Sequence, residues 1–299
     1  MRIARTVAEL RMLLAPGRRE GGLLGLIPTM GALHEGHLSL IRRARAECDV
    51  VVMSLFVNPA QFRAGEDLDG YPRDEARDRS LAQAEGVDVV FAPDPDAVYP
   101  DGFQTTVELS ELGRELEGDD AGRGPSHLRG VATIVTKLFN MVQPDVAYFG
   151  QKDAQQTYAI RRLVLDLDMP VRIEVLPTVR EPDGLALSSR NAYLSPAERE
   201  RAAALPQALR ASETLAAAGE RDPIELLAAA RAVLSTAGIE PEYLVLRSAA
   251  NLSPVERIEA PSLLLVAARI GRTRLIDNTL LGVPEATVAS PAEREEAPV

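Results

Sequence analysis

Two of the three histidines in the chain, His34 and His37, lie three positions apart around Gly36 in the segment PTMGALHEGHLSLI. Histidine N–H groups can donate hydrogen bonds to phosphate oxygens while negative charge develops on them. A helix N-terminus adds unpaired backbone N–H groups and a partial positive charge, and a glycine lets a ligand approach the backbone closely. The pattern therefore favours phosphate chemistry over a pair of merely buried histidines.

The same segment has a superficial likeness to the zinc motif HExxH. That motif would need its second histidine at position 38, where the chain has Leu38. Neither a cysteine cluster nor a suitably spaced third histidine completes a metal site. Zinc is therefore not expected, and the sequence leaves the ligands of any metal unknown.

The elements around the motif place it at the end of a strand. The apolar run at 22–27 predicts a buried strand, and the apolar spacing from residue 37 predicts a helix. Strands and helices then alternate, which predicts an α/β fold with a Rossmann-like, doubly wound parallel sheet. We expect strands at 23–28, 50–57, 87–93, 146–150 and 171–179, and helices at 7–15, from 36, at 75–85, 128–143 and 153–167.

Polar residues also follow other predicted strands, in the segments 56–62, 148–156 and 177–195. Ligands bind at the carboxyl ends of strands in this architecture, so we expect the segments to converge on one cleft. Their cations could clamp a triphosphate, and their hydroxyls and neutral amides could orient a ligand, although any single amide could equally be structural. These residues are Lys152 and Arg190, Ser188 and Ser189, and Asn58, Gln61 and Gln156.

The character of the sequence changes near residue 195. Two alanine-rich helices at 195–220 and 222–238 precede strands at 242–248 and 262–270, which predicts a smaller C-terminal α+β domain. The Gly- and Asp-rich stretch at 117–126 predicts a mobile surface loop. We therefore predict a Rossmann-like domain at 1–184, a C-terminal domain at 185–284 and, because the end is charged and poor in large apolar groups, a disordered tail at 285–299.

The composition excludes several classes of protein. The chain has 299 residues, of which 46% are hydrophobic and 26% charged, and a net charge of −11. That charge argues against nucleic-acid binding, which needs a basic face. No apolar stretch is long enough to suggest a membrane span or a secretion signal. The single cysteine, Cys48, lies beside an apolar run, which indicates a packing role in a reducing, cytoplasmic environment.

Six segments, taken in order, resemble the pantoate-beta-alanine ligase family of the HxGH nucleotidyltransferase superfamily, which includes class I aminoacyl-tRNA synthetases. The resemblance covers roughly residues 1 to 284, and the set is far more specific than HxGH alone. The segments are PTMGALHEGH, FVNPAQF, DLDGYPR, FGQKDAQQ, VREPDGLALSSRN and LLVAARIGRTRLIDN.

The resemblance implies an ATP-dependent ligase. In this family ATP adenylates pantoate with release of pyrophosphate, and beta-alanine then displaces AMP to form the amide. It also implies Mg²⁺ on the phosphates, a C-terminal domain that acts as a lid, and a homodimer formed through the N-terminal domain.

The resemblance further implies roles for individual residues. His37 would be the proton donor, and His34, Lys152 and Arg190 would act with it on the reacting phosphates. Val179 would meet the adenine, Gln61 and Gln156 would hold pantoate, and Asn58 would be a further substrate-binding residue. The implied ATP-binding residues are Met30, Gly31, Ala32, Leu33, His34, Glu35, Gly36, His37, Gly150, Gln151, Lys152, Asp153, Val179, Leu187, Ser188, Ser189 and Arg190.

The chain departs from the family pattern at Gln151, Ala154 and Leu128, where glutamate, an aromatic residue and phenylalanine are usual. None of these changes removes a group assigned to the chemistry.

Two alternatives stay open. Another adenylyl transferase of the superfamily would need cations to bind a phosphorylated acceptor. The residues expected to face the acceptor here are instead the neutral amides Asn58, Gln61 and Gln156. A non-catalytic nucleotide sensor would not need groups aimed at developing charge, such as the two histidines.

Overall fold

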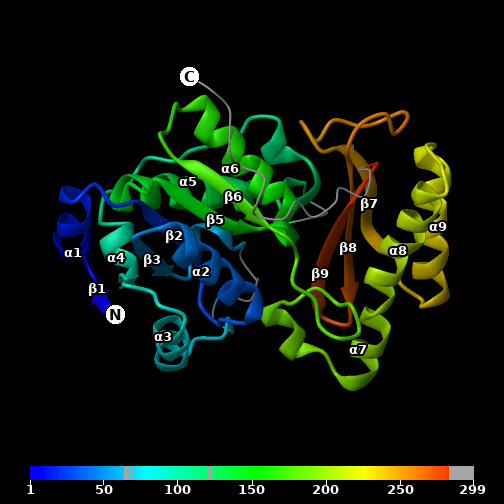
Figure 1. Ribbon diagram of the computed structural model, residues 1–299. Helices are drawn as coiled ribbons and strands as arrows, with labels where there is room; N and C mark the ends of the chain where they lie inside the picture. The colour runs from blue at the N-terminus through cyan, green and yellow to red at the C-terminus, as the bar shows by residue number, and fades with distance from the viewer. Residues whose placement is uncertain (64–67, 69, 120–122, 283–299) are drawn as a thin grey trace.

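The computed structural model describes residues 1–63, 68, 70–119 and 123–282. It divides into a part built on a parallel sheet and a part built on a small antiparallel sheet (Figure 1). The predicted tail at 285–299 lies outside the described residues. None of the helices among the described residues is long and apolar enough to cross a membrane.

The larger sheet has six parallel strands in the order β1-β4-β3-β2-β5-β6, which confirms the predicted Rossmann-like fold. The edge strand β1 was not predicted, because three residues are too few to show a pattern. The strands are β1 (Arg2–Ala4), β2 (Leu24–Thr29), β3 (Val50–Leu55), β4 (Val89–Phe91), β5 (Val146–Gly150) and β6 (Arg172–Leu176). The helices are α1 (Val7–Arg19), α2 (Glu35–Glu47), α3 (Glu75–Ala84), α4 (Pro95–Val98), α5 (Pro125–Val142) and α6 (Ala154–Asp166).

Helices cover both faces of this sheet because successive strand residues point to opposite sides. On β3, Val52 packs in a cluster with residues of α1, α5 and α6, whereas its neighbours Val51 and Met53 pack in a cluster with residues of α2 and α3. The other central strands divide their side chains between the two clusters in the same way. Two apolar layers therefore hold the sheet rigid.

The strand order reverses between β2 and β5, which are hydrogen-bonded neighbours in the centre of the sheet. The chain leaves β2 toward α2 on one face and leaves β5 toward α6 on the other. Connections that diverge in this way open a crevice at the carboxyl ends of the strands.

Up to residue 282, where the described part of the chain ends, the C-terminal part carries three α-helices and three strands: α7 (Pro196–Ala202), α8 (Ala204–Ala217), α9 (Pro223–Thr236), β7 (Pro241–Ser248), β8 (Ser262–Ile270) and β9 (Thr273–Leu281). The helix predicted at 195–220 is interrupted near Ala203, because Pro206 cannot donate to the carbonyl four residues earlier. Strand β9 was not predicted. Helices α8 and α9 cover the face of this sheet that is turned away from the parallel sheet (Figure 1).

The other face of the small sheet packs against the Rossmann-like part. Ala154 at the start of α6 contacts the cluster that contains Leu263 and Leu265 of β8. Ala154 is 3% exposed, so the small side chain at this position lets β8 approach closely. Alanine at position 154, where the family usually has an aromatic residue, therefore fits the close contact between the Rossmann-like part and the C-terminal part.

A buried ion pair also joins the two parts. Arg274 of β9 donates two hydrogen bonds of 2.8 Å to Glu117, and the Tyr243 hydroxyl donates a third to the same carboxylate at 2.7 Å. The prediction of a surface loop at 117–126 is therefore wrong at Glu117, which is 7% exposed. Residues 120–122 of that stretch lie outside the described residues.

The domain division at residues 184 and 185 stays a prediction. Leu185 supports it, because its side chain packs in the cluster formed by the C-terminal helices and strands.

Helix α5 packs very closely against the short 3-10 helix η1 (Pro59–Gln61). A Cβ atom on Gly130 would lie 2.3 Å from the carbonyl oxygen of Ala60 and 2.6 Å from Cα of Gln61. Both atoms belong to the backbone, which cannot move away without displacing η1. Glycine at this position is therefore required by the close approach, and it sets where Gln61 lies.

We predict that Gly130→Ala lowers the free energy of unfolding by about 2 kcal/mol, because the clash outweighs the better helix propensity of alanine. Gly113→Ala is the matched control, since the nearest atom to a Cβ there is 3.9 Å away. Denaturant unfolding of both variants and the wild type measures the difference. Equal stabilities of the two variants would contradict the packing argument.

Candidate active site

A cavity of about 790 Å³ opens at the carboxyl ends of β2 and β5, with β8 and β9 forming part of its wall. Most residues predicted to bind ATP or substrate line it: Met30, His34, Gly36, His37, Asn58, Gln61, Gly150, Lys152, Asp153, Gln156, Val179, Leu187, Ser188, Ser189 and Arg190. Gly31, Ala32, Leu33, Glu35 and Gln151 are predicted ATP residues that do not line it. The assignment of both groups to ATP or substrate stays a prediction.

The two histidines lie together at the start of α2. Their ring centroids are 4.1 Å apart, and the backbone N–H of His34 donates to Nδ1 of His37 at 3.3 Å. The His37 proton is therefore on Nε2 in the neutral ring. A Cβ on Gly36 would lie 3.0 Å from the His34 ring, so the missing side chain makes room for this ring.

Both histidines are neutral at pH 7. Burial, followed by the positive charge of Lys152, lowers the pKa of His34 to about 4. Burial, followed by the neighbouring His34, lowers the pKa of His37 to about 3. Neutral imidazoles can still donate an N–H hydrogen bond, and both histidines line the cavity. The pair thus offers uncharged donors to the cavity.

The loop before the histidines is held by a carboxylate. Asp78 of α3 is 1% exposed and accepts hydrogen bonds from the backbone N–H groups of Ala32 and Leu33 at 2.9 and 2.8 Å. Gly31 and Ala32 both have positive φ angles, a conformation that is costly for alanine. The buried carboxylate therefore stabilises a strained turn that brings the chain from β2 into α2.

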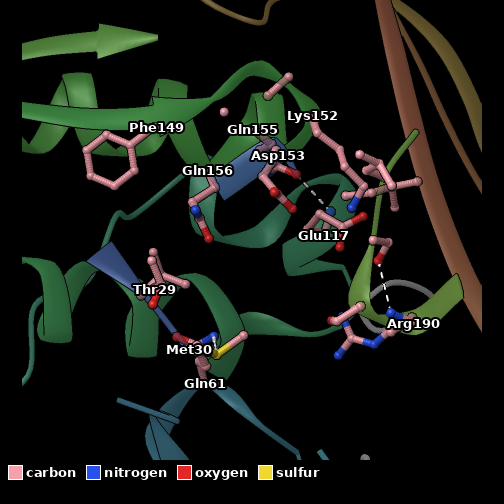
Figure 2. A pocket seen from close by; sticks show the side chains of 18 of the residues that line it. Thr29, Met30, Gln61, Glu117, Phe149, Lys152, Asp153, Gln155, Gln156 and Arg190 are labelled. Carbon is pink, nitrogen blue, oxygen red and sulfur yellow. Dashed lines mark hydrogen bonds between the residues drawn. The ribbon is translucent and has the colours of Figure 1, made fainter. Parts of the chain in front are cut away.

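Two cations lie on the same side of the cavity, Lys152 from the short helix η4 (Gln151–Asp153) and Arg190 from η5 (Ser189–Tyr193), as Figure 2 shows. The Lys152 ammonium forms no ion pair with the described residues. Its backbone carbonyl accepts a hydrogen bond of 2.9 Å from Asn278 of β9. Gln151 donates to the same asparagine at 3.2 Å, so glutamine in place of the usual glutamate serves the contact between the two parts.

The neutral amides lie on the opposite side of the cavity from these cations (Figure 2). Gln61 donates from Nε2 to the Met30 sulfur at 2.9 Å, and Gln156 points toward both residues. The Gln156 side chain makes no hydrogen bond with the described residues. Of the predicted residues, the two cations and the two glutamines therefore lie on opposite sides of the cavity (Figure 2). Arg123 also lines the cavity and donates to the backbone carbonyl of Gln61 at 3.4 Å.

Comparison with known proteins agrees with this geometry. A family model described as pantoate-beta-alanine ligase matches residues 2–280. The chain belongs to this family. It is similar to pantothenate synthetases of Agrobacterium fabrum, with 51% identity over 94% of this chain and 96% of the relative, and of Thermotoga neapolitana, with 50% identity over 94% and 100%.

Solved structures of the family have the same fold. The pantothenate synthetase of Thermus thermophilus is 46% identical and superposes with a TM-score of 0.86, covering 93% of this chain and 99% of its own. A pantoate-beta-alanine ligase of Francisella tularensis, described as complexed with beta-gamma ATP and beta-alanine, is 34% identical with a TM-score of 0.77. That match covers 94% of this chain and 97% of the other.

Sequence reasoning did not identify several residues that position the site. The third histidine, His127 of α5, is 5% exposed, lines the cavity, and its Nδ1 lies 3.1 Å from the backbone carbonyl of Gln61. Asp78 and Asn278 hold the two loops that carry His34 and Lys152. These three residues act on backbone groups far away in the sequence, so no local spacing marks them.

Two further residues have simple explanations, one predicted ATP-binding residue that does not line the cavity and one departure from the family pattern. Glu35 is exposed and its carboxylate pairs with Arg42, so it faces away from the cavity. Leu128, where phenylalanine is usual, is 1% exposed and lines the cavity, so the smaller side chain widens it locally. The described residues bring no three His, Cys, Asp or Glu side chains together in a metal-binding group.

We predict that the ring signals of His34 and His37 do not titrate between pH 8 and pH 5 in NMR spectra of the ligand-free protein. The reason is that burial keeps both rings neutral, whereas an exposed histidine titrates near about pH 6.5. His34→Gln and His37→Gln assign the signals. A midpoint near 6.5 for either signal would contradict the neutral pair.

Proposed function

We propose that the chain is an ATP-dependent ligase that adenylates pantoate with release of pyrophosphate and then condenses the adenylate with beta-alanine to give pantothenate and AMP. One observation carries the proposal. In a chain of the pantoate-beta-alanine ligase family, a single cavity combines two neutral histidine donors with Lys152 and Arg190 on one side and Gln61 and Gln156 on the other.

The cationic side suits the triphosphate of ATP. Lys152 and Arg190 would clamp the phosphates, and the hydroxyls of Ser188 and Ser189 would add neutral donors. Val179 would contact the adenine and Leu187 would contact ATP, and both residues line the cavity. The Francisella relative, crystallised with an ATP analogue and beta-alanine by its description, supports these substrates.

In the first step a carboxylate oxygen of pantoate attacks the α-phosphorus, and the bond from that phosphorus to the bridging oxygen breaks as pyrophosphate leaves. Negative charge grows on the phosphate oxygens. The N–H groups of His34 and His37 would donate to them, with the His37 proton on Nε2. Because both rings are neutral, they add donors without drawing the attacking carboxylate into an ion pair.

The neutral amides on the pantoate side likewise keep the attacking carboxylate of pantoate out of an ion pair. An arginine would hold the pantoate carboxylate more tightly, but it would also stabilise the charge that must attack ATP. Gln61 and Gln156 would orient pantoate without this cost. In the second step the amine of beta-alanine attacks the acyl carbon, AMP leaves, and the nitrogen loses a proton as the amide forms.

Mg²⁺ would neutralise part of the phosphate charge when it is bound with ATP. The predicted ATP-binding residues include two carboxylates, Glu35 and Asp153. Glu35 is paired with Arg42 at the surface. Asp153, which lines the cavity, is therefore the residue that would hold the ion from the protein side. A single carboxylate fits an ion whose other ligands are phosphate oxygens and water.

We predict that His34→Ala or His37→Ala slows adenylate formation by about 10²- to 10³-fold, the usual loss for a donor that stabilises a developing oxyanion. Pyrophosphate exchange into ATP measures this step. For the wild type, exchange should require pantoate. Exchange that requires a phosphorylated acceptor in place of pantoate would favour another adenylyl transferase, no exchange with either acceptor would favour a sensor, and near-normal rates in either variant would refute the histidine roles.

We predict that Gln61→Ala and Gln156→Ala each weaken pantoate binding by about 1 to 3 kcal/mol while ATP affinity stays unchanged. Isothermal titration with each ligand separately measures both. Gln83→Ala is the matched control, because Gln83 is exposed on α3. Loss of ATP binding with pantoate binding retained would show that the two sides of the cavity are assigned the wrong way round.

We further propose that the enzyme is a cytoplasmic homodimer formed through the Rossmann-like part, as the family resemblance implies. The buried free thiol of Cys48 is compatible with a reducing environment. Sedimentation at micromolar concentration should give twice the mass of one chain. A particle with the mass of a single chain would contradict the dimer.

A further inference from the structure

We propose that Tyr99, which does not line the cavity, is a positioning residue for pantoate: its hydroxyl holds the amide of Asn58, and Asn58 turns Gln61 so that Gln61 presents hydrogen-bond donors to the substrate. The proposal rests on the proposed function and names a residue that acts at its pantoate side. Tyr99 follows α4, far in the sequence from η1.

Backbone groups fix the orientation of Asn58. Its Oδ1 accepts from the N–H of Ala60 at 3.3 Å, and its Nδ2 donates to the carbonyl oxygen of Gly130 at 3.1 Å. The Tyr99 hydroxyl donates to the same Oδ1 at 2.7 Å, the shortest of the hydrogen bonds that hold this amide. Asn58 is 1% exposed, so a lost partner cannot be replaced by bulk water.

The orientation of Asn58 determines that of Gln61. The second Nδ2 proton of Asn58 is donated to Oε1 of Gln61 at 3.1 Å. The Gln61 oxygen is thereby occupied, and its Nε2 faces Met30 and the cavity. One N–H contacts the weakly accepting Met30 sulfur, so the other is available to a ligand. Gln61 consequently offers donors to the cavity, which suits the carboxylate or hydroxyl oxygens of pantoate.

Tyr99 is itself held from several sides. Its ring packs against Phe56, with centroids 6.2 Å apart, and edge-on against Phe103 at 5.1 Å. The ammonium of Lys137 lies 5.8 Å from the ring centroid. Burial raises the pKa of Tyr99 to about 12, so the hydroxyl keeps its proton over the range in which the enzyme can be assayed. These contacts allow a residue outside the cavity to fix a group inside it.

Steady-state kinetics of Tyr99→Phe test the proposal. The change removes one hydrogen bond and keeps the ring, so KM for pantoate should rise about three- to tenfold, while KM for ATP and kcat stay within about twofold of the wild type. Tyr158→Phe is the matched control, because Tyr158 is half-buried outside the cavity and should leave all three constants unchanged.

A double-mutant cycle shows whether Tyr99 acts through Asn58. In the Asn58→Ala background, Tyr99→Phe should change KM for pantoate less than about twofold. Gln61→Glu, which keeps the oxygen that faces Asn58 and replaces only the donor, should raise KM for pantoate more than Tyr99→Phe does. This variant tests the donor arrangement even if Tyr99→Phe does not fold.

Three outcomes would overturn the proposal. An unchanged KM for pantoate in Tyr99→Phe, an equal effect of Tyr99→Phe in both backgrounds, or wild-type pantoate binding in Gln61→Glu would each exclude the arrangement. A wild type that turns over ATP and beta-alanine only with another acid would refute the proposed function and this inference together. If only the inference fails, the wild type still uses pantoate, whereas it does not if the proposed function fails, so the two failures can be distinguished.

Discussion

The site depends on one constraint of the sheet, the reversal of strand order between β2 and β5. Two neighbouring parallel strands send their chains to opposite faces, so no connection covers the gap at their carboxyl ends. Each strand delivers a different group to this gap: the histidine turn follows β2 and the Lys152 segment follows β5. The strand order alone thus brings the histidine turn and the Lys152 segment to the same crevice.

Electrostatics then divides the cavity. The cations Lys152 and Arg190 are half-buried and line the cavity, whereas burial keeps the two histidines neutral. Lys152 contributes to this neutrality, because its charge opposes protonation of both rings. A residue that would clamp phosphate therefore also keeps the neighbouring donors in the protonation state they need.

Much of the fold and of the site could be predicted from the sequence, because the relevant patterns are local. Alternating apolar runs predicted the parallel sheet, and the segments that follow its strands were predicted to converge on one cleft, which His34 and His37 line; phosphate binding there stays a prediction. What could not be predicted depends on contacts between distant segments: the clamp of Asp78 on Leu33, the pairing of Asn278 with Gln151, and the burial of Glu117 in a stretch rich in Gly and Asp. Strand β9 was missed because polar residues that serve these contacts interrupt its alternation.

Because Asn278 contacts the Lys152 segment, the amino-acid sequences of the two parts of the chain constrain each other. Asn278 bonds two backbone carbonyls and one side chain of η4, and Ala154 makes room for β8 just beyond it. Each side of this contact fits the other, so the C-terminal part is not an interchangeable module. A chimera that takes β8 and β9 from a relative with an aromatic residue after η4 would have to take residues 151–154 with them.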